Sequence, residues 1–243
     1  MTPETKFVSL IVPLYNEENR LGKSLPPVFE YCRKSPWQWE ILCVDDGSSD
    51  RTCEELRKLQ ASFASMRIIR QKENRGKGYA VRHGLQEACG EYLLFSDADF
   101  STPIEEVSKL MQSIAEGYDL AIGSRGLQDS NVEVRQAWLR DTTGKMGNWI
   151  IRTMLPLEFA DTQCGFKMMT RKAAGLIVPR MSIDGFAFDI EMLTIALVRG
   201  LRVAEVPVTW KNVEESKVHA IHTLRVLSDV FAIRYCLAMS GYT

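Results

Sequence analysis

The sequence of 243 residues lacks the features that mark several specialised protein classes. No apolar run approaches the roughly 18–20 residues of a membrane-spanning helix. The N-terminus, MTPETKFVSLIVPLYNEE, has no basic segment followed by a cleavable apolar stretch, so we expect no secretion signal. The formal net charge of -1 creates no strong overall field, and we expect no nucleic-acid partner.

Cysteine pairs and two common phosphate-binding motifs are also missing. The six cysteines are scattered without a CxxC pair, which argues against structural zinc and disulfides and favours a reducing cytoplasm. The RGKG stretch at 75–78 is not a P-loop, because GxxxxGK[ST] is absent. GxGxxG is absent too, which argues against a dinucleotide-binding enzyme.

What the sequence does contain is an alternation of strand and helix patterns. We expect strands at 7–13, 40–44, 66–70, 92–95, 119–124 and 203–208. We expect helices at 20–34 with a proline interruption, 51–64 with Asp50 as N-cap, 104–116 and 188–198. The segment 161–170 is expected to return toward the sheet. This alternation predicts an α/β fold with a parallel sheet, formed by a single domain.

The most informative stretch is EYLLFSDADFSTP at 91–103, where a short apolar run ends in Asp97 and Asp99. Residues two apart in an extended segment point to the same side, so both carboxylates can face one point. That point lies at the carboxyl end of a strand, where open α/β sheets bind ligands. The pair predicts a hard divalent cation that also binds substrate phosphates. The alternative is a polar turn that caps a helix beginning near Pro103.

Two other expected strands also end in polar residues, at 15–17 (Tyr-Asn-Glu) and at Asp45–Asp46. Parallel strands would place all three ends along one edge of the sheet. Carboxylates there could accept hydrogen bonds from ribose hydroxyls and base N–H groups, while Lys77 and a metal ion would face a diphosphate. The three strand ends together predict a nucleotide site.

Five motifs in this order, VPLYNEE, VDDGSSD, NRGKGYAV, SDADFSTP and IGSR, resemble family 2 glycosyltransferases of the GT-A fold. DTQCGFKMMTRKAA, FAFDIEML and EVPVTW…EESK further resemble the dolichyl-phosphate β-glucosyltransferases, which are relatives of the mannose synthases. The resemblance implies a Rossmann-like three-layer sandwich with a mostly parallel central sheet and C-terminal amphipathic helices. Residues 1–125 would bind the nucleotide sugar, and residues 126–243 would bind the acceptor.

The same resemblance implies roles for individual residues. The nucleotide pocket would include Pro13, Tyr15, Glu17, Asp45, Asp46, Lys77, Asp97, Ala98 and Gln163. Asp97 and Asp99 would form the DxD pair that holds Mg²⁺ or Mn²⁺ on the donor diphosphate, with Asp99 acting in catalysis. Arg125, Arg140 and Lys217 would surround the donor and acceptor phosphates, with Arg135 as an alternative to Arg140. Ser101 stands where mannose synthases carry Gln, which favours the glucosyl branch.

Two segments combine basic and apolar residues in a way that predicts peripheral membrane contact. One is 126–160, with Arg135, Arg140, Lys145 and Arg152 among aromatic residues, which could instead cover the sheet. The other is the tail, with an apolar face of Ile221, Leu224, Leu227, Val230 and Phe231. From this N-terminal sequence we expect no membrane anchor of the kind that the resemblance implies for the eukaryotic glucosyl enzymes. We therefore expect a bacterial or archaeal polyprenyl phosphate at the cytoplasmic face of a membrane.

The expected reaction moves glucose from UDP-glucose to a polyprenyl phosphate with inversion. A monophosphate acceptor, with a second pKa of about 6, is already anionic and needs no general base. A sugar hydroxyl would need one, and Asp161, Asp184 and Asp189 are candidates. The alternatives are mannosyl transfer from GDP-mannose and a non-catalytic nucleotide-sugar or lipid-binding module. A sugar-nucleotide pyrophosphorylase would need a GxGTRL-like start, which residues 11–17 lack.

Overall fold

The computed structural model describes residues 5–132, 153–211, 220–239 and 241–242. Within these residues, seven strands form the main sheet in the order β3-β2-β1-β4-β7-β5-β8. The strands are β1 (Phe7–Leu14), β2 (Gln38–Asp45), β3 (Met66–Arg70), β4 (Tyr92–Ser96), β5 (Leu120–Ser124), β7 (Phe166–Thr170) and β8 (Val203–Pro207). The helices are α1 (Leu21–Lys34), α2 (Thr52–Gln60), α3 (Lys77–Glu87), α4 (Val107–Ala115), α6 (Arg171–Ile177), α7 (Phe188–Val198) and α8 (Ala220–Ala238), with short 3₁₀ turns at Ile104–Glu106 and Val178–Arg180.

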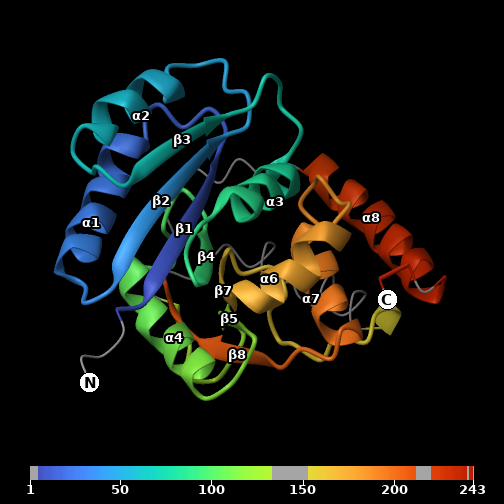
Figure 1. Cartoon of the computed structure of the whole chain (residues 1–243). Coiled ribbons are helices and arrows are strands. Elements are labelled where there is room, and N and C mark those ends of the chain that lie inside the picture. Colours follow the sequence, from blue (N-terminus) through green and yellow to red (C-terminus); the bar gives the residue numbers. More distant parts are fainter. Residues whose placement is uncertain (1–4, 133–152, 212–219, 240, 243) are drawn as a thin grey trace.

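Helices cover both faces of this sheet (Figure 1). Alternate residues of β1 enter different hydrophobic clusters: Val8 and Leu10 pack with α1, α2 and α4, whereas Ile11 packs with α3, α6 and α7. This alternation is what a strand buried on both faces requires. The expected three-layer α/β sandwich of the GT-A fold is confirmed.

The sheet is mostly parallel and changes direction at one strand. β1 pairs in parallel with both β2 and β4, so that Leu10 lies opposite Ile41 and Leu94. β7, formed by the segment expected to return to the sheet, is antiparallel and lies between β4 and β5. The chain builds outward from β1 on both sides. The carboxyl end of β1 is therefore the topological switch point at which such sheets bind ligands.

The six expected strands are confirmed to within a few residues, but three details of the expected helices are wrong. α1 continues through Pro26 and Pro27, because its apolar face, including Leu25 and Phe29, stays buried against the sheet. The N-cap of α2 is Arg51, not Asp50. Asp50 lies one residue before this N-cap, and its carboxylate still accepts a hydrogen bond from the Thr52 N–H at 2.9 Å. α2 also ends at Gln60, four residues earlier than expected.

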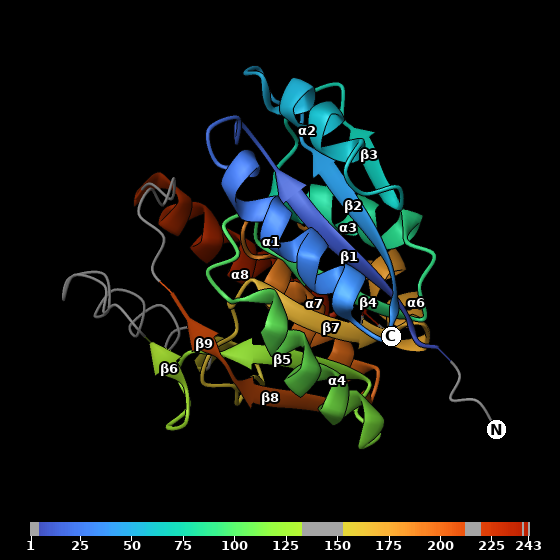
Figure 2. The same ribbon diagram turned by 90° about the vertical axis from the view of Figure 1, so that its left-hand side faces the viewer.

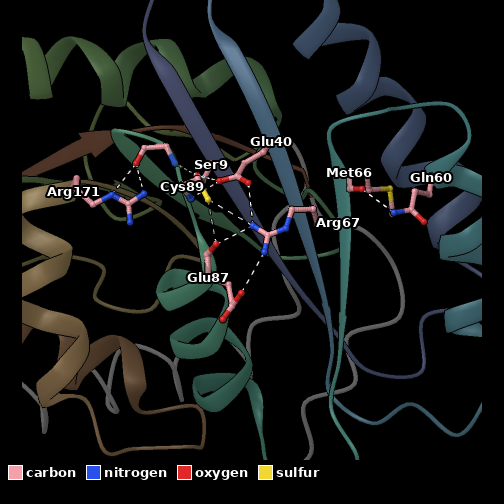
Figure 3. Close-up of polar contacts among 9 residues, drawn as sticks. Ser9, Glu40, Gln60, Met66, Arg67, Glu87, Cys89 and Arg171 are labelled. Atoms are coloured by element: carbon pink, nitrogen blue, oxygen red, sulfur yellow. Dashed lines mark hydrogen bonds and ion pairs between the residues drawn. The ribbon is translucent and has the colours of Figure 1, made fainter.

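A polar cluster ties the strands together at the edge opposite the switch point (Figure 3). The buried Glu40 carboxylate accepts hydrogen bonds from Ser9 Oγ at 2.6 Å and from the Cys89 N–H, and it pairs with Arg67 at 3.3 Å. Arg171 Nε donates to the Gly90 carbonyl at 3.0 Å. These contacts link the beginnings of β1, β2, β3 and β4. They therefore fix the register of these strands, and with it the relative positions of their carboxyl ends at the switch point.

The C-terminal helix α8 lies on the outside of the molecule, next to α7 (Figure 1). Val230, which was expected on an exposed apolar face, is buried with Ile233 in the core. Phe231 of the expected face is exposed on α8, as are Tyr235 and Met239, and each of these three side chains is about two-thirds exposed. The side chains of Ile221 and Leu224 lie outside the described part. No helix in the described ranges is long and apolar enough to cross a membrane.

The expected basic segment 126–160 is only partly described. Its beginning forms a turn and the short strand β6 (Asn131–Val132), which pairs with β9 (Thr209–Trp210). Figure 2 shows this pair and α8 on the side of the molecule toward which the arrow of β5 points. The basic residues Arg135, Arg140, Lys145 and Arg152 lie outside the described residues.

Candidate active site

The loops after β1 and β2 are joined at the switch point by one asparagine. Asn16 has a φ of 55°, a left-handed conformation that asparagine tolerates better than most residues. Its N–H donates to Ser48 Oγ and its side-chain oxygen accepts the Ser49 N–H, both at 2.9 Å. The two loops therefore form one rigid wall of the site.

Three residues predicted to line the nucleotide pocket lie at the end of β1 and in the loop that follows it. Pro13 is buried in β1 opposite Val44, and Tyr15, at 43% exposed, is open to a ligand. The Glu17 N–H donates to Thr52 Oγ1 at 2.7 Å, and its carboxylate pairs with Arg20 at 3.2 Å. The nucleotide-binding roles of these residues stay predictions.

Asp45 and Asp46, at the end of β2, are both engaged with the protein itself. Asp45 is fully buried and accepts the Ser48 N–H at 2.9 Å. Asp46 accepts the N–H groups of Arg75 and Gly76 at 3.0 and 2.7 Å. Burial raises the pKa of Asp46, and these two hydrogen bonds oppose the increase. Both carboxylates shape the surrounding loops, and a direct contact with nucleotide stays a prediction.

The loop before α3 can pack closely only because it contains glycine on both sides of Lys77. Gly76 has a φ of 117°, and a Cβ atom there would lie 2.4 Å from the Asp184 carbonyl oxygen. A Cβ atom on Gly78 would lie 2.5 Å from the Ile183 carbonyl oxygen. Residues 183–184 thus press the loop into place, and Lys77 becomes the first residue of α3.

Asp97 and Asp99 follow β4 in a tight turn. The Asp97 N–H donates to the Gly165 carbonyl at 3.0 Å, and Asp99 Oδ1 accepts the Ser101 N–H at 3.0 Å. Ala98 between them is buried. Phe100, with a φ of 46°, closes the turn. Hydrogen bonds therefore fix the backbone of Asp97 and the carboxylate of Asp99 in this turn.

Lys77 and Asp97 form a direct ion pair at this turn. Lys77 Nζ lies 2.6 Å from Asp97 Oδ1, and the two side chains are 22% and 36% exposed. Burial lowers the pKa of the Lys77 ammonium, but the nearby carboxylates of Asp97 and Asp189 outweigh it and raise the pKa above its ordinary value. Lys77 therefore places a stable positive charge beside the DxD pair.

The donor set around Asp97 fits a hard divalent cation shared with a substrate. In the described part of the chain, no cluster of three or more His, Cys, Asp or Glu residues could hold a metal ion. The protein would therefore supply two carboxylate ligands, those of Asp97 and Asp99. Mg²⁺ commonly completes such a site with water and substrate phosphates. A Cβ atom on Gly165 would lie 2.1 Å from Asp97 Oδ2, so the carboxylate uses the space that this glycine leaves.

A buried ion pair lies behind this site. Lys167 Nζ is 2.5 Å from Asp189 Oδ1 and 2.5 Å from the Cys164 carbonyl oxygen, and Lys167 is fully buried. Burial raises the pKa of Asp189, against the opposing charges of Lys167 and Lys77. Sequence reasoning named Asp189 as a candidate base and missed Lys167. The available signal was a single lysine in the otherwise apolar strand FKMMT.

Arg125, after β5, is held by Asp161. Arg125 Nε lies 2.6 Å from Asp161 Oδ2 and Nη2 lies 3.0 Å from Oδ1, a bidentate arrangement. Burial raises the pKa of Asp161, but the Arg125 guanidinium outweighs it and leaves that pKa below its ordinary value. The exposed Gln163 donates its N–H to the same carboxylate at 3.2 Å.

All three carboxylates considered as general bases have cationic partners. Asp161 pairs with Arg125 and Asp189 with Lys167, while Asp184 pairs with Arg82 at 2.6 Å. The cation partners therefore occupy all three carboxylates in this structure, and for Asp161 the partner leaves the pKa below its ordinary value. The two other residues expected at the phosphates, Arg140 and Lys217, lie outside the described residues.

Solved structures share the fold of this chain. Mannosyl-3-phosphoglycerate synthase from Rubrobacter xylanophilus matches 98% of this chain and 76% of its own, with a TM-score of 0.69 and 19% identity. Glucosyl-3-phosphoglycerate synthase from Mycobacterium tuberculosis, in complex with Mn²⁺, UDP and glucosyl-3-phosphoglycerate, matches 94% of this chain and 80% of its own, with a TM-score of 0.66 and 17% identity. At these identities the likeness shows the fold alone.

Curated relatives are more similar in sequence. The dolichyl-phosphate beta-glucosyltransferase of Saccharomyces cerevisiae is 32% identical over 260 residues, covering 98% of this chain and 77% of the relative. That of Mus musculus is 34% identical over 227 residues, covering 88% and 70%. The family model described as glycosyl transferase family 2 matches residues 9–176, which include Lys77, Asp97 and Asp99. The chain is a glycosyltransferase and belongs to family 2.

Proposed function

We propose that the protein transfers glucose from UDP-glucose to a polyprenyl phosphate, with inversion at the anomeric carbon. The observation that carries the proposal is the position of Asp97, Asp99 and Lys77 at the switch point of a GT-A sheet. The relatives named dolichyl-phosphate beta-glucosyltransferase, which align with almost the whole chain, support the choice of donor sugar and acceptor.

Asp97 and Asp99 would hold Mg²⁺ or Mn²⁺, and Lys77 would lie beside the donor diphosphate. The ion, when bound, supplies positive charge where negative charge develops on the departing diphosphate. Tyr15 and Glu17 line the adjoining wall, where a nucleoside would lie. The protein thus binds the donor with both cationic and carboxylate groups at one edge of the sheet.

The acceptor monophosphate would supply the nucleophile itself. A phosphate oxygen attacks the anomeric carbon, the bond from that carbon to the UDP oxygen breaks, and UDP leaves with the electron pair. No proton has to be removed, which agrees with the pairing of Asp161, Asp184 and Asp189 to cations. Arg125 would reduce the repulsion between the two phosphate groups, because its guanidinium matches phosphate oxygens.

α8 offers a surface for peripheral contact with a membrane. Phe231, Tyr235 and Met239 follow one another at intervals of four residues, and all three are exposed. Arg225 and Arg234 are exposed on the same helix. An apolar stripe with flanking cations fits an anionic bilayer surface. The double variant Phe231→Ser/Tyr235→Ser should lose cosedimentation with anionic vesicles, whereas unchanged binding would contradict this surface.

Calorimetric titration tests the donor, and product extraction tests the transfer. UDP-glucose and GDP-mannose are each titrated with and without Mn²⁺, and radiolabelled glucose is then followed into the organic phase with a polyprenyl phosphate. We expect metal-dependent binding of UDP-glucose and a labelled lipid product. Preference for GDP-mannose would overturn the glucosyl assignment.

The matched variants are Asp99→Ala and Glu116→Ala, which each remove one carboxylate. Glu116 is exposed at the end of α4, away from the switch point. Asp99→Ala should reduce turnover by about 10²-fold or more, as expected for loss of a group that stabilises the transition state. Glu116→Ala should leave turnover unchanged. Full turnover of Asp99→Ala in Mg²⁺ would contradict the proposed metal site.

A further inference from the structure

We propose that the Lys77 ammonium and the divalent metal compete for Asp97 in the free enzyme and cooperate once the donor diphosphate is bound. This inference rests on the metal site in the proposed function. It concerns the order and strength of metal binding, which the reaction itself does not determine. The structural basis is the 2.6 Å contact between Lys77 Nζ and Asp97 Oδ1.

Asp97 holds its carboxylate against both Lys77 and Gly165 in this structure. Its N–H is bound to the Gly165 carbonyl, and its carboxylate packs so closely on Gly165 that a Cβ atom there would overlap it. Asp99, the second carboxylate, is held in the same turn by the Ser101 N–H. A metal that uses both carboxylates must therefore come close to the ammonium.

Lys77 is also held in place from its own side. Its backbone is fixed by the glycines on either side, and its Nζ lies 6.0 and 5.8 Å from the ring centres of Phe186 and Phe188. Asp189 adds a favourable charge nearby and is itself held 2.5 Å from Lys167. The ammonium is thus a built-in cation of the donor-free site.

The two cations repel each other when they share one carboxylate in a partly buried site. A donor diphosphate changes this balance, because its oxygens can accept from the ammonium and bind the metal at the same time. Metal binding should therefore be weak without nucleotide and strong with it. Lys77 should have opposite effects on metal affinity in these two conditions.

The test is direct Mn²⁺ binding to the full chain, measured by electron paramagnetic resonance with and without UDP. In Lys77→Met, which removes the charge and keeps an unbranched side chain, we expect nucleotide-free Mn²⁺ to bind roughly ten-fold more tightly. With saturating UDP, the same variant should bind Mn²⁺ roughly ten-fold more weakly than the wild type. This change of sign is the signature of competition followed by cooperation.

Lys72→Met is the matched control, because Lys72 is exposed two residues before Asn74 and the substitution changes the net charge equally. It should leave both affinities unchanged, and Lys77→Arg should stay close to the wild type. Thermal unfolding establishes that Lys77→Met is folded. Unchanged or weaker nucleotide-free binding in Lys77→Met would overturn the competition. Absence of Mn²⁺ binding to the wild type even with UDP would instead overturn the metal site in the proposed function.

Discussion

Arg125 and Asp161 form a bidentate ion pair across 36 residues of sequence, with nitrogen–oxygen distances of 2.6 and 3.0 Å. The Arg125 N–H also donates to Asp161, at 3.1 Å. Asp161 in turn receives the Gln163 N–H, and its own N–H donates to Glu205 at 2.8 Å. The guanidinium is therefore fixed before any substrate arrives.

Replacement of Arg125 by lysine should reduce activity far more than it reduces stability. Lysine keeps the charge but has no planar fork, so it loses the bidentate contact and its fixed direction. We expect kcat/KM for glucosyl transfer to fall about 10- to 100-fold. Initial rates with UDP-glucose and a polyprenyl phosphate measure this. Arg202→Lys, at the opposite end of the sheet before β8, is the control and should be neutral, and an equal loss in both variants would refute a specific role.

Asp161 should make the protein sensitive to acid. Its pKa in the folded state lies below the unfolded value of about 3.9, because the Arg125 guanidinium outweighs the effect of burial. The stability it contributes is complete above the unfolded pKa and is lost as the pH falls through the folded pKa. We expect Asp161→Asn to lose less stability than the wild type between about pH 5 and pH 2. Urea unfolding across this range tests it, and parallel curves would contradict the assignment.

The sequence predicted the site elements that depend on local spacing. Asp97 and Asp99, two residues apart after an apolar run, could be placed at a strand end without knowledge of the fold. Lys77 was expected near the nucleotide because a diphosphate needs cations and because the family resemblance places it there. The placement of the two aspartates needed only the period of a strand and the alternation of strands with helices.

The ion pairs could not be predicted, because they depend on how distant strands meet. Lys167 reaches Asp189 only because β7 enters the sheet antiparallel between β4 and β5. That insertion has no local signal in the sequence. The position of Val230 also could not be predicted from local spacing. The helical spacing of the apolar residues in the tail fits an exposed face as well as a buried one, and packing against α7 buries Val230.

Lys167→Met should strongly destabilise the protein. The change leaves Asp189 buried without the cation that lies 2.5 Å away, and loss of one partner of a buried pair costs about 3–5 kcal/mol. Urea unfolding measures the free energy of unfolding. The double variant Lys167→Met/Asp189→Leu removes both charges and should recover most of the loss. A single-variant effect below about 1 kcal/mol would show that the pair is not needed for stability.

Gly165→Ala should separate the metal site from the fold. The new Cβ atom would lie 2.1 Å from Asp97 Oδ2, and the atom that must move is the end of a short side chain rather than backbone. We therefore expect Asp97 to rotate away at a cost in stability of about 1 kcal/mol. Binding of Mn²⁺ in the presence of UDP should weaken about ten-fold or more, because one carboxylate ligand is displaced.

Gly175→Ala is the matched control, because nothing lies within 4 Å of a Cβ atom at this position in α6. It should raise the free energy of unfolding by about 0.5–1 kcal/mol, because alanine has a higher helix propensity than glycine. It should leave Mn²⁺ binding unchanged. Calorimetry with Mn²⁺ and UDP, alongside urea unfolding, reports both quantities for the two variants. If Gly165→Ala keeps the wild-type Mn²⁺ affinity, the Asp97 carboxylate is not a metal ligand in its present orientation.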